Sequence, residues 1–269
     1  MKRPIAFLFT IVMVFALTAC KNGKSPAVED ASVELTVYAA ASLTETLTKA
    51  AELYRESAPN VTFTFTFDSS GTLKTQIAEG ADCDIFISAA QKQMNEMDIT
   101  SDKNTAGLDF VDSSTRFNIV ENKVVLVVPD NNPAGIASFD DIATKAVSLL
   151  AIGNSDVPVG QYAQEVLINM GIFDRISEKI TYGSNVKELT TWVGENTVDC
   201  GIVYATDAYS AGLQVIAEAP EGMLNTPVLY PAAVLKTAKN PGAAKAFLDF
   251  LKTDACAAVF QEVGFSVPG

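Results

Sequence analysis

The chain has 269 residues, of which 32 are acidic and 19 basic, so its formal net charge is −13; it contains no histidine. An acidic surface argues against nucleic acid or an anionic lipid surface as a partner. Without histidine the chain cannot form Ser–His or Cys–His nucleophile pairs, and it lacks the commonest metal ligand. The sequence also lacks a Cys-x-x-Cys pair, a phosphate loop and a Gly-x-Gly-x-x-Gly segment. We therefore predict a protein that is not an enzyme and that carries no cofactor.

The first residues are typical of an exported lipoprotein. A basic start precedes an apolar run from residue 5 to residue 17, which is short for a membrane span. The segment Leu17-Thr18-Ala19-Cys20 resembles a bacterial lipobox, which implies cleavage before Cys20 and lipid on its thiol. We predict a signal peptide at 1–19, a lipidated flexible tether at 20–32 and an extracytoplasmic protein that touches the membrane only through its lipid. The alternative is an uncleaved anchor helix.

After the tether, short apolar segments alternate with helical patterns, which favours an α/β architecture. In chain order, we expect strands near 35–41, 61–67, 85–88, 124–128, 149–152, 180–182, 201–204 and 228–235. We expect helices that start at 43, 138 and 206 and one that opens at 156–160 and runs to 170. Further helices are expected near 72–79, 91–97, 186–195, 241–251 and 254–262. The length suits either one large α/β unit or two smaller lobes.

Four of the expected strand-to-helix junctions carry a hydroxyl or bare backbone N–H groups, at Ser42, Ser70, Val159 and Val186. Ser42 and Glu45 fit the capping-box pattern Ser-x-x-Glu. The positive end of a helix dipole, with a hydroxyl or free N–H groups, can bind an anion without a cation. Ligands of open α/β sheets bind where the carboxyl ends of strands and these helix starts meet.

Other residues have structural interpretations. Cys83, Cys200 and Cys256 lie in apolar segments, and we expect three small buried side chains; a disulfide with one spare thiol is the alternative. Ser88 is expected to cap the helix that follows it. Asp140 and Asp141 are expected at a helix start, where their negative charge interacts favourably with the positive end of the helix dipole.

Nearly the whole chain after residue 32 resembles the molybdate-binding proteins of bacterial ABC importers. The resemblance is carried by five motifs in order, namely Ala39-Ala40-Ala41-Ser42-Leu43-Thr44, Ser69-Ser70-Gly71-Thr72-Leu73, Asp84-Ile85-Phe86-Ile87-Ser88-Ala89, Val157-Pro158-Val159-Gly160-Gln161-Tyr162-Ala163 and Gly201-Ile202-Val203-Tyr204-Ala205-Thr206-Asp207-Ala208. It implies a two-lobed type II periplasmic-binding-protein fold, with a mixed sheet flanked by helices in each lobe and the ligand in the cleft between them. Lobe one would be 33–119 plus 221–269 and lobe two 120–220, with crossings near 118–123 and 220–228.

The resemblance also implies the ligand and the residues that hold it. A tetrahedral molybdate or tungstate oxyanion would be bound by neutral donors only, with no direct metal ligation: Ser42, Ser70, the backbone N–H groups of Val159 and Val186, and the phenol of Tyr204. Asp68 departs from some members and is expected to point outward or to cap the next turn. The protein would be a monomer that delivers its ligand to a membrane permease. The alternatives are a sulfate- or thiosulfate-binding protein of the same fold, or an enzyme that acts on an oxyanion-bearing metabolite through a reactive Cys83 or Cys200.

Overall fold

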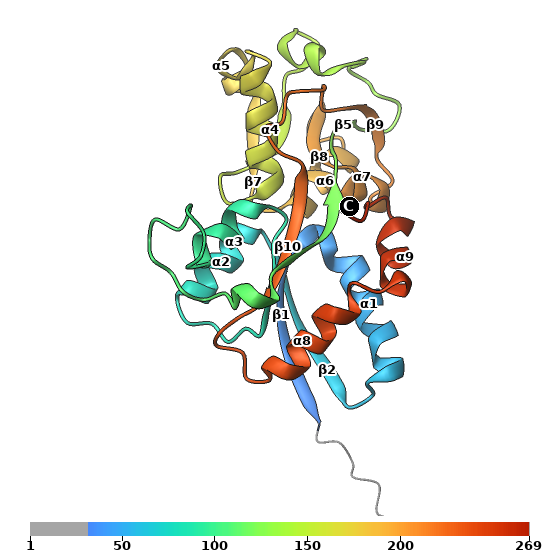
Figure 1. The fold of residues 1–269 in the computed structure, drawn as a ribbon. Helices are drawn as coiled ribbons and strands as arrows, with labels where there is room; N and C mark the ends of the chain where they lie inside the picture. The colour runs from blue at the N-terminus through green and yellow to red at the C-terminus, as the bar shows by residue number, and fades with distance from the viewer. Residues whose placement is uncertain (1–31, 269) are drawn as a thin grey trace, which may run out of the picture. The chain divides into compact units, whose positions relative to one another are not determined.

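The computed structural model describes residues 32–268, which form two five-stranded mixed sheets flanked by helices (Figure 1). This confirms the predicted fold class. The signal peptide, the lipobox at Cys20 and most of the tether lie outside the described residues. Within residues 32–268, no helix has both the length and the apolar character needed to cross a membrane.

The first sheet has the strand order β2-β1-β3-β10-β4. Its strands are β1 (Val33–Ala40), β2 (Val61–Asp68), β3 (Ile85–Ile87), β4 (Phe117–Asn122) and β10 (Val228–Val234). Strand β1 runs parallel to β2 and β3, whereas β10 is antiparallel to both β3 and β4. Parallel β1, β2 and β3 therefore end at the same edge of the sheet.

The second sheet repeats this plan with the order β7-β6-β8-β5-β9. Its strands are β5 (Val124–Val128), β6 (Leu150–Gly153), β7 (Ile180–Gly183), β8 (Cys200–Tyr204) and β9 (Gln214–Glu218). Strand β6 is parallel to β7 and β8, and β5 is antiparallel to β8 and β9. Strands β6, β7 and β8 again end at one edge.

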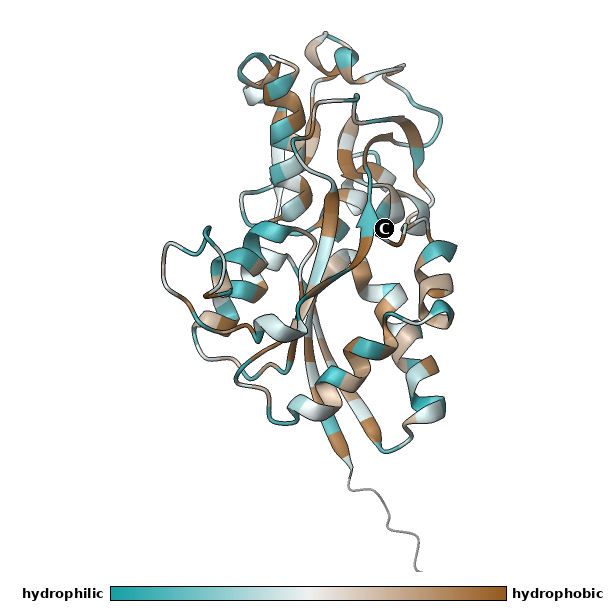
Figure 2. Cartoon of the chain, viewed as in Figure 1, coloured by the Kyte–Doolittle hydropathy of each residue, from teal (hydrophilic) through white to brown (hydrophobic). Residues whose placement is uncertain are grey.

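Helices cover the sheets because the strands are buried and need an apolar layer on each face. In the first half these are α1 (Thr44–Ser57), α2 (Ser70–Ala78), α3 (Gln91–Met97), α8 (Pro241–Phe250) and α9 (Asp254–Glu262). Figure 1 shows α1, α8 and α9 on one side of β1 and β10, with α2 and α3 on the other. The second half has α4 (Pro158–Asn169), α5 (Phe173–Ile176), α6 (Val186–Gly194) and α7 (Ala205–Ser210). Figure 2 shows hydrophobic residues concentrated along the strands and many hydrophilic residues on helices and loops.

The chain passes from the first sheet to the second between Asn122 and Val124 and returns between Glu218 and Val228. The lobe boundaries at 119/120 and 220/221 stay a prediction. The sequence pattern misses β4 and β9, the strands that precede the first and the second crossing. Both are edge strands, and β9 is largely exposed, so neither shows a strong apolar pattern.

Two predicted caps are wrong. Helix α3 follows Ala90, and the hydroxyl of Ser88 instead donates to the Ala90 carbonyl at 2.7 Å and accepts from the Ala90 N–H at 3.2 Å. The Ser42–Glu45 capping box does not form, because α1 begins at Thr44 after a 3₁₀ turn and has no side-chain cap. By contrast, Ser138 and Asp141 do form a capping box, at the start of a 3₁₀ helix (Phe139–Ala143).

Candidate functional site

Strand register in the first sheet brings Ser42 and Ser70 together. Ala40 at the end of β1 pairs with Asp68 at the end of β2, and each serine follows two residues later. Ser42 lies in the 3₁₀ turn Ala41–Leu43, and Ser70 is the first residue of α2. Because β1 and β2 are parallel neighbours, both hydroxyls emerge at the same sheet edge.

The second sheet repeats this geometry. Gly153 at the end of β6 pairs with Gly183 at the end of β7, and the helices that follow begin at Pro158 and Val186. Val159 is the second residue of α4 and Val186 the first of α6, so neither N–H has an acceptor within its own helix. The positive ends of two helix dipoles therefore meet at this edge.

One cavity collects all five residues predicted to bind the ligand. Ser42, Ser70, Val159, Val186 and Tyr204 line one narrow cavity, and all five are buried. The remaining lining residues are small or apolar, except for Asp68 and Ser69; they are Ala40, Ala41, Asp68, Ser69, Ala89, Val157 and Pro158. The wall thus combines residues from both sheets.

Hydrogen-bond directions show which protons are available in this cavity. The Ser70 hydroxyl accepts from the Ala89 N–H at 3.0 Å, so its own proton is free to be donated. The Tyr204 phenol donates to the Ala89 carbonyl at 3.1 Å, which links the second sheet to the first. Burial raises the pKa of Tyr204 well above its ordinary value, so the phenol stays protonated and can only act as a neutral group at physiological pH.

The Ser42 hydroxyl lies 3.1 Å from the phenol oxygen of Tyr230, a buried residue of β10. This long-range partner explains why Ser42 does not cap α1. Glu45, the other half of the expected capping box, instead binds Lys187 of α6, with its two carboxylate oxygens 2.9 and 3.0 Å from the ammonium group.

The cavity wall is electrically unusual for an anion site. The lining residues found within 32–268 include neither lysine nor arginine. Lys187 directly follows the lining residue Val186 in the sequence. Its ammonium group is paired with the carboxylate of Glu45, which lies in the half that contains the first sheet.

Asp68 is among the lining residues, and its carboxylate accepts from the Ser69 N–H at 2.7 Å. The expectation that it caps the following turn is wrong, and the expectation that it points outward stays a prediction. Ser69, not Asp68, caps α2 by accepting from the Thr72 N–H.

A close backbone contact holds the two halves together beside the cavity. The Gly71 N–H donates to the Asp156 carbonyl at 2.9 Å. A Cβ added at Gly71 would lie 2.5 Å from that oxygen and 2.7 Å from the Asp156 Cα. Only glycine therefore permits this approach of α2 to the segment before α4.

The cysteines do not support the alternative of a thiol enzyme. Cys83, Cys200 and Cys256 are all free and buried, as the interpretation as apolar side chains predicts. Burial raises the pKa of each thiol to about 12. A reactive cysteine has a lowered pKa, so these thiols are inert at neutral pH.

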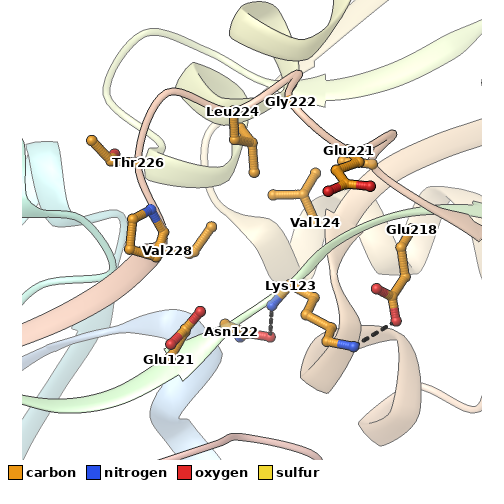
Figure 3. A pocket seen from close by; sticks show the side chains of 12 residues that line it. Glu121, Asn122, Lys123, Val124, Glu218, Glu221, Gly222, Leu224, Thr226 and Val228 are labelled. Carbon is orange, nitrogen blue, oxygen red and sulfur yellow. Dashed lines mark hydrogen bonds and ion pairs between the residues drawn. The ribbon is translucent and has the colours of Figure 1, made fainter. Parts of the chain in front are cut away.

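A larger hollow of about 440 Å³ lies along the two segments that connect the sheets (Figure 3). Three carboxylates line it, from Glu121, Glu218 and Glu221, against the single cation Lys123, which pairs with Glu218 at 2.8 Å. This excess of negative charge makes the hollow unsuitable for an anion. The smaller cavity is the better candidate site.

Sequence reasoning misses three polar residues behind the cavity wall: Asn122, Asp207 and Tyr230. All three are buried. The signal for Asp207 is its place in the motif that ends β8, whereas Tyr230 and Asn122 lie in strands with no polar pattern to mark them. Tyr230 and Asn122 bond to residues from distant parts of the chain, which no local pattern reveals.

Two mixed sheets, whose paired strand ends and helix starts enclose a small cavity, define the class of two-sheet periplasmic binding proteins. Comparison with known families is more specific: the model for bacterial extracellular solute-binding proteins matches residues 35–266, and the chain belongs to that family. Its relatives are solute-binding proteins rather than enzymes.

Named relatives confirm the predicted resemblance. A putative ABC transporter substrate-binding lipoprotein of Bacillus subtilis is 30% identical over 98% of both chains. The molybdate-binding protein of Escherichia coli is 36% identical over 87% of this chain and 89% of its own, and that of Haemophilus influenzae is 34% identical over 88% and 91%.

Solved structures of related proteins have the same fold. The substrate-binding domain of a putative molybdenum ABC transporter from Clostridium difficile is 35% identical, with a TM-score of 0.66, over 88% of this chain and all of that one. The periplasmic molybdate-binding protein of Azotobacter vinelandii has a TM-score of 0.75 at 22% identity, over 87% and all of the respective chains. A sulfate-binding protein of Mycobacterium tuberculosis shares the fold at 16% identity, with a TM-score of 0.73, over 87% and 86%.

Proposed function

We propose that this protein binds molybdate and tungstate outside the cytoplasm and delivers them to the permease of an ABC transporter. The observation that carries the proposal is the single cavity in which Ser42, Ser70, Val159, Val186 and Tyr204 meet. These residues present hydroxyl and backbone N–H donors from both sheets. The names of the relatives point to the same ligand.

The number of donors is sufficient for tight binding. A hydrogen bond to a charged group contributes on the order of 1.5–3 kcal/mol. Five such bonds span the roughly 8–12 kcal/mol of a micromolar-to-nanomolar site. The Tyr204 proton is shared with the Ala89 carbonyl, so its contribution is the difference between that bond and the bond to the anion.

A wall of donors also selects the kind of anion. A protonated oxyanion whose proton faced one of the five donors would find no acceptor there, which costs free energy. Sulfate is fully deprotonated, but its oxygens lie closer to the central atom. In a cavity shaped for the longer bonds of molybdate, they would stay too far from some donors. Molybdate and tungstate are nearly the same size, so this geometry barely separates them.

Lipid attachment at Cys20 would keep the binding protein at the membrane beside its permease. The proposal rests on the segment Leu17-Thr18-Ala19-Cys20 and on the B. subtilis relative, which is named a lipoprotein. Closure of the two halves around the anion would present the loaded form to the permease.

Thermal unfolding of the purified full-length protein with an anion panel tests the function. A ligand that binds only the folded state stabilises it by about 4 kcal/mol at a thousand times its Kd. Molybdate and tungstate should therefore raise the Tm strongly, and sulfate and phosphate at equal concentration should do little.

The site is tested with Ser42→Ala and Ser70→Ala, each expected to weaken molybdate binding about ten- to a hundredfold. Ser88→Ala is a matched control, because its hydroxyl bonds only to Ala90 in the structure. If sulfate stabilises as much as molybdate, the ligand is wrong and a sulfate-binding protein is the better assignment. If both serine variants bind like wild type, the site is wrong.

A further inference from the structure

Behind the cavity, a chain of hydrogen bonds runs from the crossover between the sheets to Ser42. Asn122 is the last residue of β4, where the chain leaves the first sheet. Its side-chain amide nitrogen donates to the phenol oxygen of Tyr230 at 3.1 Å and to the hydroxyl of Thr206 at 2.8 Å. Tyr230 in turn lies 3.1 Å from the hydroxyl of Ser42. Asn122, Tyr230, Thr206 and Ser42 are all buried.

The direction of these bonds is fixed at one end. The Lys123 N–H donates to the side-chain carbonyl oxygen of Asn122 at 2.8 Å, as Figure 3 shows. A backbone N–H can only donate, so the carbonyl oxygen of Asn122 must be the atom that faces it. The amide nitrogen therefore points toward Tyr230 and Thr206, and the Tyr230 oxygen accepts.

The phenol of Tyr230 must then place its own proton on another group, because it is fully buried. Two hydroxyls of the cavity wall adjoin it, Ser42 and Tyr204. The Tyr204 phenol donates to the Ala89 carbonyl, and among the described residues no hydrogen bond joins its oxygen to Tyr230. Ser42, 3.1 Å away, is therefore the acceptor for the Tyr230 proton. When Tyr230 donates to Ser42, the serine oxygen is occupied as an acceptor and its proton is released toward the cavity.

We propose that Asn122 and Tyr230 are positioning residues that orient the Ser42 hydroxyl as a donor to the bound oxyanion. This inference rests on the proposed function and explains how a neutral serine is committed to donating. A freely rotating hydroxyl could face the cavity with either its proton or a lone pair. The hydrogen bonds from Asn122 through Tyr230 to Ser42, here called the relay, exclude the second orientation. An oxyanion that carries a proton therefore finds no acceptor at Ser42.

A double-mutant cycle tests whether Tyr230 acts through Ser42. Molybdate affinity is measured by calorimetry for wild type, Ser42→Ala, Tyr230→Phe and the double variant, with Tyr54→Phe as a control for loss of a buried phenol in the same half. Tyr230→Phe should weaken binding about three- to tenfold, within the range of one hydrogen bond. In the Ser42→Ala background the same change should have less than about a twofold effect, because no hydroxyl remains to be oriented.

Full additivity in the cycle, or unchanged affinity in Tyr230→Phe, would overturn the relay. Either result leaves the proposed function standing, provided that wild type binds molybdate. Failure of wild type to bind molybdate would instead refute the proposed function. Thermal unfolding confirms that each variant is folded at the temperature of the titration, so a loss of stability is not mistaken for a loss of binding.

Asn122→Asp tests the direction of the relay. Aspartate at this position accepts from Tyr230, so the phenol must accept from Ser42 and the serine proton turns away from the cavity. The added charge weakens all dianions alike, and it cancels in the affinity ratio of molybdate to hydrogen phosphate at pH 8. That ratio should fall at least about tenfold relative to wild type, because Ser42 now offers an acceptor to the phosphate proton. An unchanged ratio would show that Asn122 does not set the direction.

Discussion

Replacing Asp207 with asparagine should change how the stability of the protein depends on pH. Asp207 lies in α7, is 1% exposed, and neither of its carboxylate oxygens has a hydrogen-bond partner among the described residues. The ammonium group of Lys187 is 3.9 Å away but is shared with Glu45. Burial raises the pKa of Asp207 to about 7; Lys187 lowers the pKa, and Glu45 raises it.

The size and sign of the effect follow from this pKa. The ordinary value is 3.8, so the increase to about 7 corresponds to roughly 4 kcal/mol at 1.36 kcal/mol per pH unit. The folded state favours the neutral carboxyl. Its stabilisation is therefore complete below about pH 4, is lost as the pH rises to about 7, and stays lost above that. The phenols of Tyr204 and Tyr230, which adjoin Asp207, have raised pKa values and do not titrate in this window.

A second buried aspartate, Asp98, affects the stability of the protein over a different pH range. Burial alone would raise the pKa of Asp98, but hydrogen bonds from Ser113, Thr100 and Arg116 outweigh burial and hold it at about 2. Its stabilising contribution is present above its ordinary pKa of 3.8 and is lost as the pH falls toward 2. Asp98 is present in both wild type and Asp207→Asn, so its contribution cancels in the difference between them and is small between pH 4 and pH 8.

Urea unfolding at pH 4, 5, 6, 7 and 8 measures this difference. The free energy of unfolding of wild type should fall by roughly 4 kcal/mol relative to Asp207→Asn as the pH rises from 4 to above 7. The exposed Asp174→Asn on α5 serves as the control and should follow wild type. Parallel pH profiles for wild type and Asp207→Asn would refute the reasoning.

Three further variants address closure, charge and the membrane anchor. Gly71→Ala should weaken molybdate binding at least about tenfold and lower the stability, because its Cβ would lie 2.5 Å from the Asp156 carbonyl oxygen where the two halves meet; equal affinity by calorimetry would show that this contact is not needed. Lys187→Ala should weaken binding less than about fivefold, the range of an exposed ion pair, and affinity should vary little with salt; a hundredfold loss would mean that a cation holds the anion. Cys20→Ala should move the protein from the membrane fraction to the soluble fraction, or block its maturation, without changing its affinity; a wild-type protein already soluble would contradict the lipid anchor.

The strand-to-helix junctions could be predicted from sequence because their signal is local. An apolar run that ends in Ser42, or a proline just before Val159, identifies a helix start without knowledge of the rest of the chain. Parallel strand order then brings such starts to one edge. Tyr204 was expected only through the resemblance, since a tyrosine that ends a strand is otherwise an ordinary core residue.

The failures concern hydrogen bonds between distant residues. Ser42 and Glu45 fit a local capping box, but their actual partners, Tyr230 and Lys187, lie 188 and 142 positions away in the sequence. Asp68 was one candidate for the cap of the turn at Gly71, yet the hydroxyl of its neighbour Ser69 forms that cap. A local pattern shows which groups need partners but not which distant group will supply them.

Calorimetric titration with molybdate in the presence of a large excess of sulfate tests the central claim most directly. Because the proposed donors are all neutral and come from both sheets, we expect one molybdate per chain, with a Kd between about nanomolar and micromolar. The sulfate should leave that Kd nearly unchanged. Absence of molybdate binding, or a Kd that rises in proportion to the sulfate concentration, would contradict the assignment.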